Sequence, residues 1–296
     1  METTVDYQKQ NGAEVYRQTL LTDLPVKEKY LHVDGISTAY LEGGEGTTLV
    51  LLHGPGEPSV WWLRVMPKLV EKFRVIAPDL PGHGSSGALP GKCTKEAMLT
   101  WLDEFLSKTC DTPPVLVGHV VGGAIAAHYV IQYSTNVKQL VLVDSLGLSA
   151  FHPALRFALE YMRFMIYPSE KSQKRFMTQC MFDMDELSKG MGRQWQPFIK
   201  YNLASAQDPG KKAAAKGIMN AFSEKIPTEE LKKIAIPVAL IWGRHDKANR
   251  LKVAIRASEN YGWPLHIIED TRDDPKLERP DAFVDALQSS VAELLI

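Results

Sequence analysis

The stretch from Gly118 to Gly122 has the spacing of a catalytic turn, but one residue type makes its chemistry unusual. Its sequence is Gly-His-Val-Val-Gly. This is the frame Gly-X-Ser-X-Gly, in which a sharp turn between a strand and a helix raises a serine hydroxyl toward a substrate. Val120 occupies the serine position. Because valine has no lone pair and no exchangeable proton, this turn cannot form a covalent acyl intermediate.

A strand before this turn and a helix after it are needed to position it, and the surrounding chain has that pattern. Continuous apolar runs, which are typical of buried parallel strands, predict strands at Thr48–Leu52, Arg74–Ala77, Pro114–Val117, Gln139–Val143, Ile236–Trp242 and Leu265–Ile268. Helical patterns lie between them, at 61–73, 95–107 with Thr94 as N-cap, 121–133, 251–260 and 280–295. This alternation predicts an α/β fold with a doubly wound, mostly parallel eight-stranded sheet.

Two other segments complete the predicted organisation. Tyr30–Val33 and Ser37–Leu41 flank an Asp-Gly turn and indicate a hairpin. From 149 to 233 the pattern is helical only and rich in methionine and aromatic residues, which indicates an inserted helical cap. We therefore predict an N-terminal extension at 1–27 with one short surface helix, a core formed by 28–148 and 234–296, and a cap at 149–233.

Composition narrows the possible partners. The 296 residues carry a net charge of −1, with 45% hydrophobic and 23% charged residues, as is usual for globular proteins. This balance argues against nucleic acid or a membrane surface as the main partner. The three cysteines are far apart and show neither metal-binding nor disulfide spacing. We expect a cytoplasmic monomer or homodimer with no cofactor and no metal.

Five motifs in order resemble the capped α/β-hydrolases. They are His53-Gly54 after a strand, Asp79–Ser86, the turn at Gly118–Gly122, Ile241–Asp246 and Leu277–Pro280. The resemblance implies an α/β-hydrolase fold from residue 28 onward. It also assigns roles by position: the nucleophile falls on Val120 and the acid on Asp246. The histidine position, seven residues before Pro280, holds Asp273, so the implied triad is degenerate.

The same resemblance locates an oxyanion-hole region. One donor is expected from the backbone just after His53-Gly54, where Pro55 has no N–H; Gly56 could serve instead. The second expected donor is the backbone N–H of Val121. One of the two donors is therefore in question.

Asp246, Asp273 and His119 are the candidate catalytic residues. If the two aspartates share one pocket, their repulsion should raise the pKa of one of them, and a shared proton would allow acid–base chemistry. Alternatively, Asp273 turns outward and pairs with Arg272 or Lys276. His119, which precedes the turn, either contacts a ligand or packs behind the turn.

The density of methionine and aromatic residues in the cap predicts a pocket roof for a small apolar or aromatic molecule. The residues expected to line this pocket are His53, Trp61, Trp62, His152, Met162 and Met165. Of the two tryptophans, one is expected to face the cavity and the other the core.

Three functions are compatible with these residues. The first is non-covalent chemistry of a lyase, cyclase or isomerase type, using an aspartate or a pocket histidine. The second is an inactive pseudoenzyme that binds or senses a small molecule. The third is hydrolysis by water that an aspartate or histidine activates. An engineered knockout at Val120 would change one residue, whereas Pro55 and Asp273 also depart from the pattern.

Overall fold

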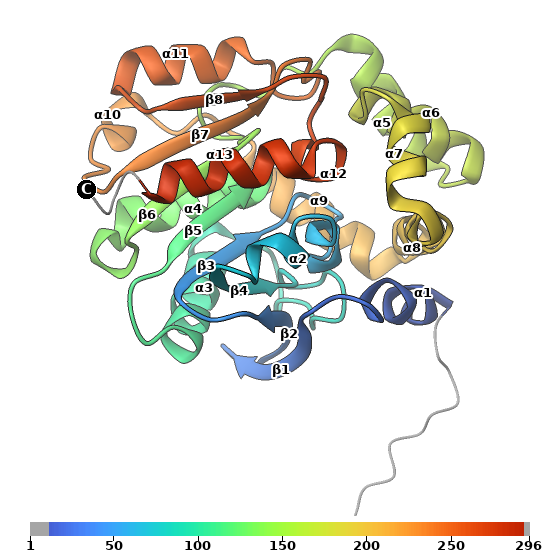
Figure 1. Cartoon of the computed structure of the whole chain (residues 1–296), viewed down its shortest axis with the longest axis horizontal. Coiled ribbons are helices and arrows are strands. Elements are labelled where there is room, and N and C mark those ends of the chain that lie inside the picture. Colours follow the sequence, from blue (N-terminus) through green and yellow to red (C-terminus); the bar gives the residue numbers. More distant parts are fainter. Residues whose placement is uncertain (1–11, 293–296) are drawn as a thin grey trace, which may run out of the picture.

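Eight strands form one sheet in the order β1-β2-β4-β3-β5-β6-β7-β8 in the computed structural model, which describes residues 12–292 (Figure 1). The strands are β1 (Lys27–Val33), β2 (Ile36–Gly43), β3 (Thr47–Leu52), β4 (Phe73–Pro78), β5 (Val115–His119), β6 (Gln139–Val143), β7 (Val238–Gly243) and β8 (Leu265–Ile268). β2 pairs antiparallel with β1 and β4, and the remaining pairs are parallel. The predicted fold class is confirmed.

Local sequence explains the two kinds of strand. Asp34 and Gly35 both have positive φ, at 48° and 74°, which is the backbone of the tight turns that suit hairpins. This turn joins β1 to β2. In contrast, every residue of β5, β6 and β7 is buried, as expected where helices cover both faces of a parallel sheet.

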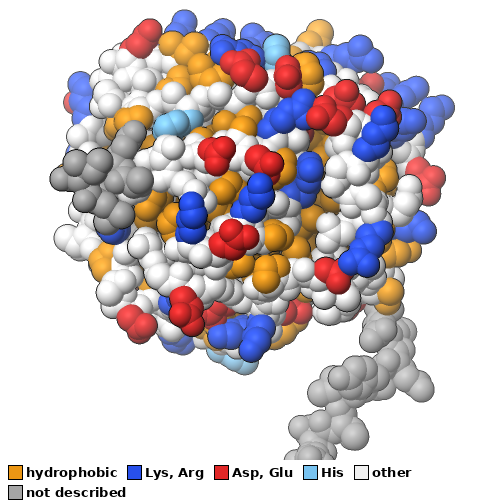
Figure 2. Space-filling model, viewed as in Figure 1, with side chains coloured by type: hydrophobic (Ala, Val, Ile, Leu, Met, Phe, Trp, Pro, Cys, Tyr) orange, Lys and Arg blue, Asp and Glu red, His pale blue; other side chains and the backbone are white. Residues whose placement is uncertain are grey.

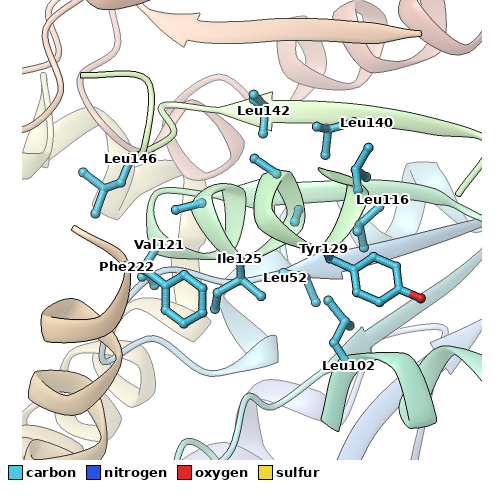
Figure 3. Close-up of a cluster of buried hydrophobic side chains, with 14 of the residues drawn as sticks. Leu52, Leu102, Leu116, Val121, Ile125, Tyr129, Leu140, Leu142, Leu146 and Phe222 are labelled. Atoms are coloured by element: carbon cyan, nitrogen blue, oxygen red, sulfur yellow. The ribbon is translucent and has the colours of Figure 1, made fainter. Parts of the chain in front are cut away.

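Helices cover the two faces of the sheet (Figure 1). One face packs against α3 (Lys95–Thr109), α4 (Val121–Gln132) and α11 (Lys252–Tyr261), and the other against α2 (Met66–Leu69) and α13 (Pro280–Ala292). Figure 3 shows Val121, Ile125 and Tyr129 of α4 among leucines of the neighbouring strands. α4 is apolar around most of its circumference, which is typical of a helix enclosed by protein. It therefore holds the preceding turn rigidly.

The helix predicted at 61–73 does not form as one element. A 3₁₀ turn, η1 (Ser59–Trp62), is followed by the single turn of α2. Pro67 lies in the first turn of α2; its ring removes one N–H donor and disfavours helical backbone in the residue before it. The pattern of apolar residues was correct, but the proline divides the helix.

Between β6 and β7 the chain is helical, as predicted for the cap. The elements are α5 (Leu155–Ile166), α6 (Glu170–Cys180), α7 (Met184–Met191), η3 (Gly192–Gln194), α8 (Trp195–Gln207), α9 (Pro209–Phe222) and α10 (Thr228–Leu231). Figure 1 shows α5 to α8 beside the sheet, on the side where α1 (Gly12–Leu21) also lies.

α1 is the short helix predicted for the N-terminal extension, but it is more than a surface helix. It packs against α8, and the side chain of Arg17 is fully buried. Arg17 Nη2 lies 2.9 Å from Asp79 Oδ2 and 2.8 Å from Glu28 Oε1. Residues 1–11 of the extension, and 293–295 of the predicted closing helix, lie outside the described residues.

The molecular surface has no dominant charge on the face that Figure 2 shows, where lysine and arginine side chains intermix with aspartate and glutamate. Within residues 12–292, no helix combines the length and the apolar character that crossing a bilayer would require.

We predict that Arg17→Met lowers the free energy of unfolding by about 3–5 kcal/mol, because Asp79 then remains buried without its cation. Burial alone would raise the pKa of Asp79, but Arg17, together with smaller contributions from His53 and two backbone N–H groups, outweighs it and holds the pKa below its ordinary value. Urea denaturation measures the loss. Arg17→Met/Asp79→Asn should recover part of it, and Lys68→Met, which breaks the exposed Lys68–Asp281 pair, should have little effect. Equal losses for the buried and exposed pairs would contradict the prediction.

Candidate active site

The turn at Val120 keeps a strained backbone although its side chain is apolar. β5 ends at His119, Val120 has φ 49° and ψ −110°, and α4 begins at Val121. A positive φ is a genuine outlier for a β-branched residue. A Cβ at Gly118 would lie 2.4 Å from the Gly122 carbonyl oxygen, and one at Gly122 would lie 2.5 Å from the Leu52 carbonyl oxygen. Close backbone packing thus requires both glycines of the frame, whichever residue lies between them.

A cavity of about 160 Å³ lies between this turn and the cap helices. Its wall is mostly aromatic and methionine side chains, with a smaller set of polar groups. The apolar part includes Trp61, Val120, Phe151, Phe157, Tyr161, Phe164, Met165, Phe176, Met177, Met181 and Met219. The polar part includes Glu57, His83, Gln173, Asn202, Ser205, Lys211, Lys212, Asp273 and Asp274. Such a wall suits a small, largely apolar ligand.

Two of the six predicted lining residues reach the cavity. They are Met165 and Trp61, whose indole Nε1 donates to Asn202 Oδ1 at 2.9 Å. Trp62 instead is fully buried against Phe283 below the cavity, so the expected division between the two tryptophans is found. His53 is also absent from the wall: Nε2 accepts from the Leu80 N–H at 2.9 Å, and the ring braces the loop.

His152 and Met162 do not line the cavity either. His152 is exposed in the segment before α5. Met162 is 54% exposed, because it lies on the outer face of α5, whereas Tyr161 and Met165 lie on the inner face. The sequence pattern placed α5 over the pocket correctly but did not resolve which face of the helix turns inward.

The predicted oxyanion-hole region forms a tight turn on the cavity wall. The Glu57 N–H donates to the Gly54 carbonyl oxygen at 3.3 Å, with Pro55 and Gly56 between them and Gly56 at φ 76°. Proline followed by a residue of positive φ is the pattern of a type II turn. Val121, the first residue of α4, has an N–H with no intrahelical acceptor. The roles of Pro55, Gly56 and Val121 in binding an oxyanion stay a prediction.

Asp273 faces inward, so the outward alternative is wrong. Its residue is 8% exposed and lines the cavity, and Oδ1 has no hydrogen-bond partner among residues 12–292. Arg272 does not pair with it but donates to the Met181 carbonyl oxygen at 2.5 Å. Lys276 pairs with Asp274 instead. Burial, together with the nearby Asp246, raises the pKa of Asp273 well above its ordinary value.

Asp246 is buried behind the cavity wall rather than on it. Its Oδ1 accepts from the N–H groups of Ala248 at 2.7 Å and Asn249 at 2.9 Å. Burial raises the pKa of Asp246 to about 6, although hydrogen bonds from Asn249, Ala248 and Asp144 oppose the shift. Burial and Asp246 also raise the pKa of Asp144 well above its ordinary value. Asp144, Asp246 and Asp273 therefore titrate as one coupled cluster, in which each pKa lies above its ordinary value.

His119 packs behind the turn, away from the cavity. Its Nε2 donates to the Asp273 backbone carbonyl oxygen at 2.6 Å, since a carbonyl oxygen can only accept. Nδ1 lies 3.1 Å from Glu57 Oε2 and 3.0 Å from Lys276 Nζ. Nδ1 of a neutral ring would accept a hydrogen bond from Lys276 Nζ, whereas Nδ1 of a protonated ring would donate one to Glu57 Oε2. His119 thus supports the Asp273 backbone; its predicted catalytic role would have to act through that contact.

Glu57, His119 and Asp274 bring ligand atoms within 4.8 Å of one another, a spacing that a metal ion could use. However, Lys276 Nζ already lies among them: it contacts Asp274 Oδ1 and is 3.6 Å from Glu57 Oε2. Burial would lower the pKa of Lys276, but Asp274 and Glu57 outweigh it and raise the pKa. The ammonium therefore supplies the positive charge in this cluster.

Sequence reasoning missed four functional candidates. Asp144 follows β6 directly, and a carboxylate at the carboxyl end of a buried parallel strand was a usable signal. Glu57 and Lys276 gave no signal, because their burial depends on tertiary packing. His83 lies in the Asp79–Ser86 motif, but the motif did not show which way its ring points. Its Nδ1 lies 3.1 Å from the Pro81 carbonyl oxygen, and Nε2 is buried on the cavity side with no hydrogen-bond partner among the described residues. Burial lowers the pKa of His83 to about 3, so the ring is neutral.

Comparison with known proteins agrees with the fold described above. The sequence profile of the alpha/beta hydrolase fold matches residues 47–270. An uncharacterized protein of Mycobacterium tuberculosis is 26% identical over 285 residues, covering 89% of this chain and 81% of that protein. The 2-hydroxy-6-oxo-6-(2'-aminophenyl)hexa-2,4-dienoic acid hydrolase of Metapseudomonas resinovorans is 25% identical over 281 residues, covering 88% of this chain and 90% of the relative.

A solved structure adds a comparison of folds. The carboxylesterase from Bacillus subtilis superposes with a TM-score of 0.82 at 18% identity, covering 95% of this chain and 97% of that one. At this identity the likeness extends to the fold alone.

We predict that Val120→Gly costs less stability than Val121→Gly. Both changes remove a buried isopropyl group and add glycine freedom to the unfolded chain, but only Val120 has a positive φ. The difference in the free energy of unfolding isolates the backbone strain and should be about 1–3 kcal/mol. Urea denaturation of both variants measures it. Equal losses would show that Val120 is not strained.

We predict that Asp273→Asn makes the free energy of unfolding less dependent on pH. The raised pKa of Asp273 means that the native chain holds a proton that the unfolded chain releases near pH 4, so its contribution to stability is full at low pH and lost as pH rises. The variant should lose this slope, about 1.4 kcal/mol per pH unit for one proton. Denaturation between pH 4 and pH 8 tests it, with the exposed Asp281→Asn as control; parallel curves for wild type and Asp273→Asn would refute it.

Proposed function

The chain belongs to the α/β-hydrolase fold family, and on that premise we propose that it binds a small apolar or aromatic molecule and catalyses proton transfer without a covalent intermediate. One observation carries the proposal. Asp273 lies buried on the cavity wall, its Oδ1 has no hydrogen-bond partner within residues 12–292, and burial raises its pKa, which favours the protonated carboxyl. A neutral carboxyl in an apolar site can donate a proton to a ligand.

The groups around Asp273 support a non-covalent mechanism. Val120 presents an isopropyl group where the family motif has a serine. Cys180 also lines the cavity, but burial, followed by Asp273, raises its pKa well above the ordinary value, so it is a thiol and a poor nucleophile. The free Nε2 of His83 supplies a hydrogen-bond acceptor on the same wall.

In the proposed reaction, Asp273 gives its proton to a ligand oxygen that gains electron density, while a water molecule takes a proton from the adjacent carbon. The hydronium ion so formed returns a proton to Asp273, so that the carboxyl and the water are both regenerated. Reactions of the lyase, cyclase or isomerase type need only such positioning and one acid. Hydrolysis by activated water has less support. Burial would raise the pKa of Glu57 on the wall, but Lys276 and His119 oppose it and hold the pKa below its ordinary value, so this carboxylate is a weak base. Asp246 lies off the wall.

The test follows proton transfer directly. Enolisable aromatic ketones, phenylacetone and benzylacetone, are incubated with the protein in deuterated water, and NMR measures exchange of their α-protons. We expect catalysed exchange that Asp273→Asn slows by roughly 10²- to 10⁴-fold, with Asp281→Asn unchanged. No catalysed exchange, or equal rates in wild type and Asp273→Asn, would contradict the assignment of Asp273 as the acid.

A second measurement addresses the absence of covalent chemistry. A fluorophosphonate probe labels activated serines, so the wild type and Val120→Ser alone should remain unlabelled, because Asp273 is an acid and not a base. Val120→Ser/Asp273→His restores both missing groups and should become labelled. Labelling of the wild type, or hydrolysis of p-nitrophenyl butyrate by it, would overturn the non-covalent mechanism.

A further inference from the structure

Two lysines lie on the cavity wall at the start of α9, where helices normally avoid positive charge. Asp208 caps this helix, and Lys211 and Lys212 follow Pro209 and Gly210 in its first turn, which contains no acidic residue. The amino end of a helix is its positive end, so cations there are unfavourable. A residue that opposes this helix preference without a stabilising contact nearby indicates a functional role.

Lys211 has no counter-ion. No carboxylate within residues 12–292 lies within 4.0 Å of its Nζ, which instead lies 5.6 Å from the centre of the Tyr201 ring. The nearest acids are otherwise engaged: Asp208 Oδ1 accepts from the Lys211 backbone N–H at 3.0 Å, and Asp79 pairs with Arg17. Burial lowers the pKa of Lys211, and Asp208 opposes the shift only in part. An anion beside Nζ would relieve this cost.

Neutral donors lie on the same wall. Asn202 and Ser205 are three residues apart on α8 and so share one face, and both line the cavity. Asn202 Oδ1 accepts from Trp61, and the amide nitrogen Nδ2 is buried with no hydrogen-bond partner in the part of the chain that the structure describes. Ser205 is 8% exposed, and its hydroxyl makes no hydrogen bond with any residue that the structure describes. Asn202 Nδ2 and the Ser205 hydroxyl can each donate a hydrogen bond, and neither has an acceptor among the residues that the structure describes.

From these donors we infer that the α8–α9 side of the cavity binds the carboxylate of an apolar or aromatic acid. Lys211 supplies the charge, while Asn202 Nδ2 and the Ser205 hydroxyl supply neutral hydrogen bonds. Charge-assisted hydrogen bonds of this kind are the stronger ones. The ring or chain of the acid then occupies the apolar part, where a cavity of roughly 150 Å³ can hold a benzene ring. The inference names the ligand class for the proposed function and rests on it.

Isothermal titration calorimetry with three anions tests the inference: phenylacetate, phenylpropanoate and phenylbutanoate, each beside its neutral amide. We expect at least one anion to bind roughly 10- to 100-fold more tightly than its amide, the value of one charge-assisted hydrogen bond. Lys211→Met should remove this preference, and Lys211→Arg should keep most of it. Lys216→Met makes the same change at an exposed position of α9 and should have no effect.

The outcomes separate the two proposals. If anion and amide bind equally, or if Lys211→Met keeps the preference, the carboxylate site is wrong while the apolar cavity remains a binding site. If neither anion nor amide binds, both the carboxylate site and the proposed binding of small aromatic molecules are overturned. Fluorescence of Trp61, which touches the cavity, reports binding independently, with Trp61→Phe as its control.

Discussion

The electrostatics of the candidate active site depend on a shortage of positive charge at the carboxyl ends of the strands. Glu57, Asp144, Asp246, Asp273 and Asp274 are all buried there. Lys276 is the buried lysine that serves them, and its contacts are with Asp274, Glu57 and His119. A buried carboxylate without a counter-ion is costly, and the cheaper state is the protonated one. Charge balance thus favours the protonated form of some of these aspartates.

This shortage of positive charge connects two departures from the family motif, Val120 at the nucleophile position and Asp273 at the histidine position. A triad needs a base next to its nucleophile, whereas here an isopropyl group and a neutral carboxyl face the same space. The rest of the framework is kept, because the elbow glycines and the type II turn at Pro55-Gly56 are set by backbone packing. Fold and chemistry can therefore diverge: the sheet holds the site in place, and three or four side chains decide what it does.

Much of the fold and part of the candidate site could be predicted from the sequence. Apolar runs and their spacing predicted the sheet, because strands that are buried on both faces consist of continuous apolar residues. The resemblance to the family motifs placed Val120 and Asp273 at the site, but it left open whether Asp273 faces the pocket or turns outward. Side-chain direction was less accessible: Met162 and Trp62 each sit next to a residue that faces the cavity, and only packing decides between neighbours. Burial of Arg17, Glu57 and Lys276 was not predictable, since each depends on partners distant in sequence.

The loop that carries Asp273 also joins the core to helix α6 of the cap. Arg272 binds carbonyl oxygens at the end of α6, and Glu278 accepts the N–H groups of Arg272 and Phe182. Movement of α6 away from the core would displace Asp273 relative to the turn at Val120. In the proposed function, ligand binding and proton transfer by Asp273 would therefore both depend on the contacts between α6 and this loop.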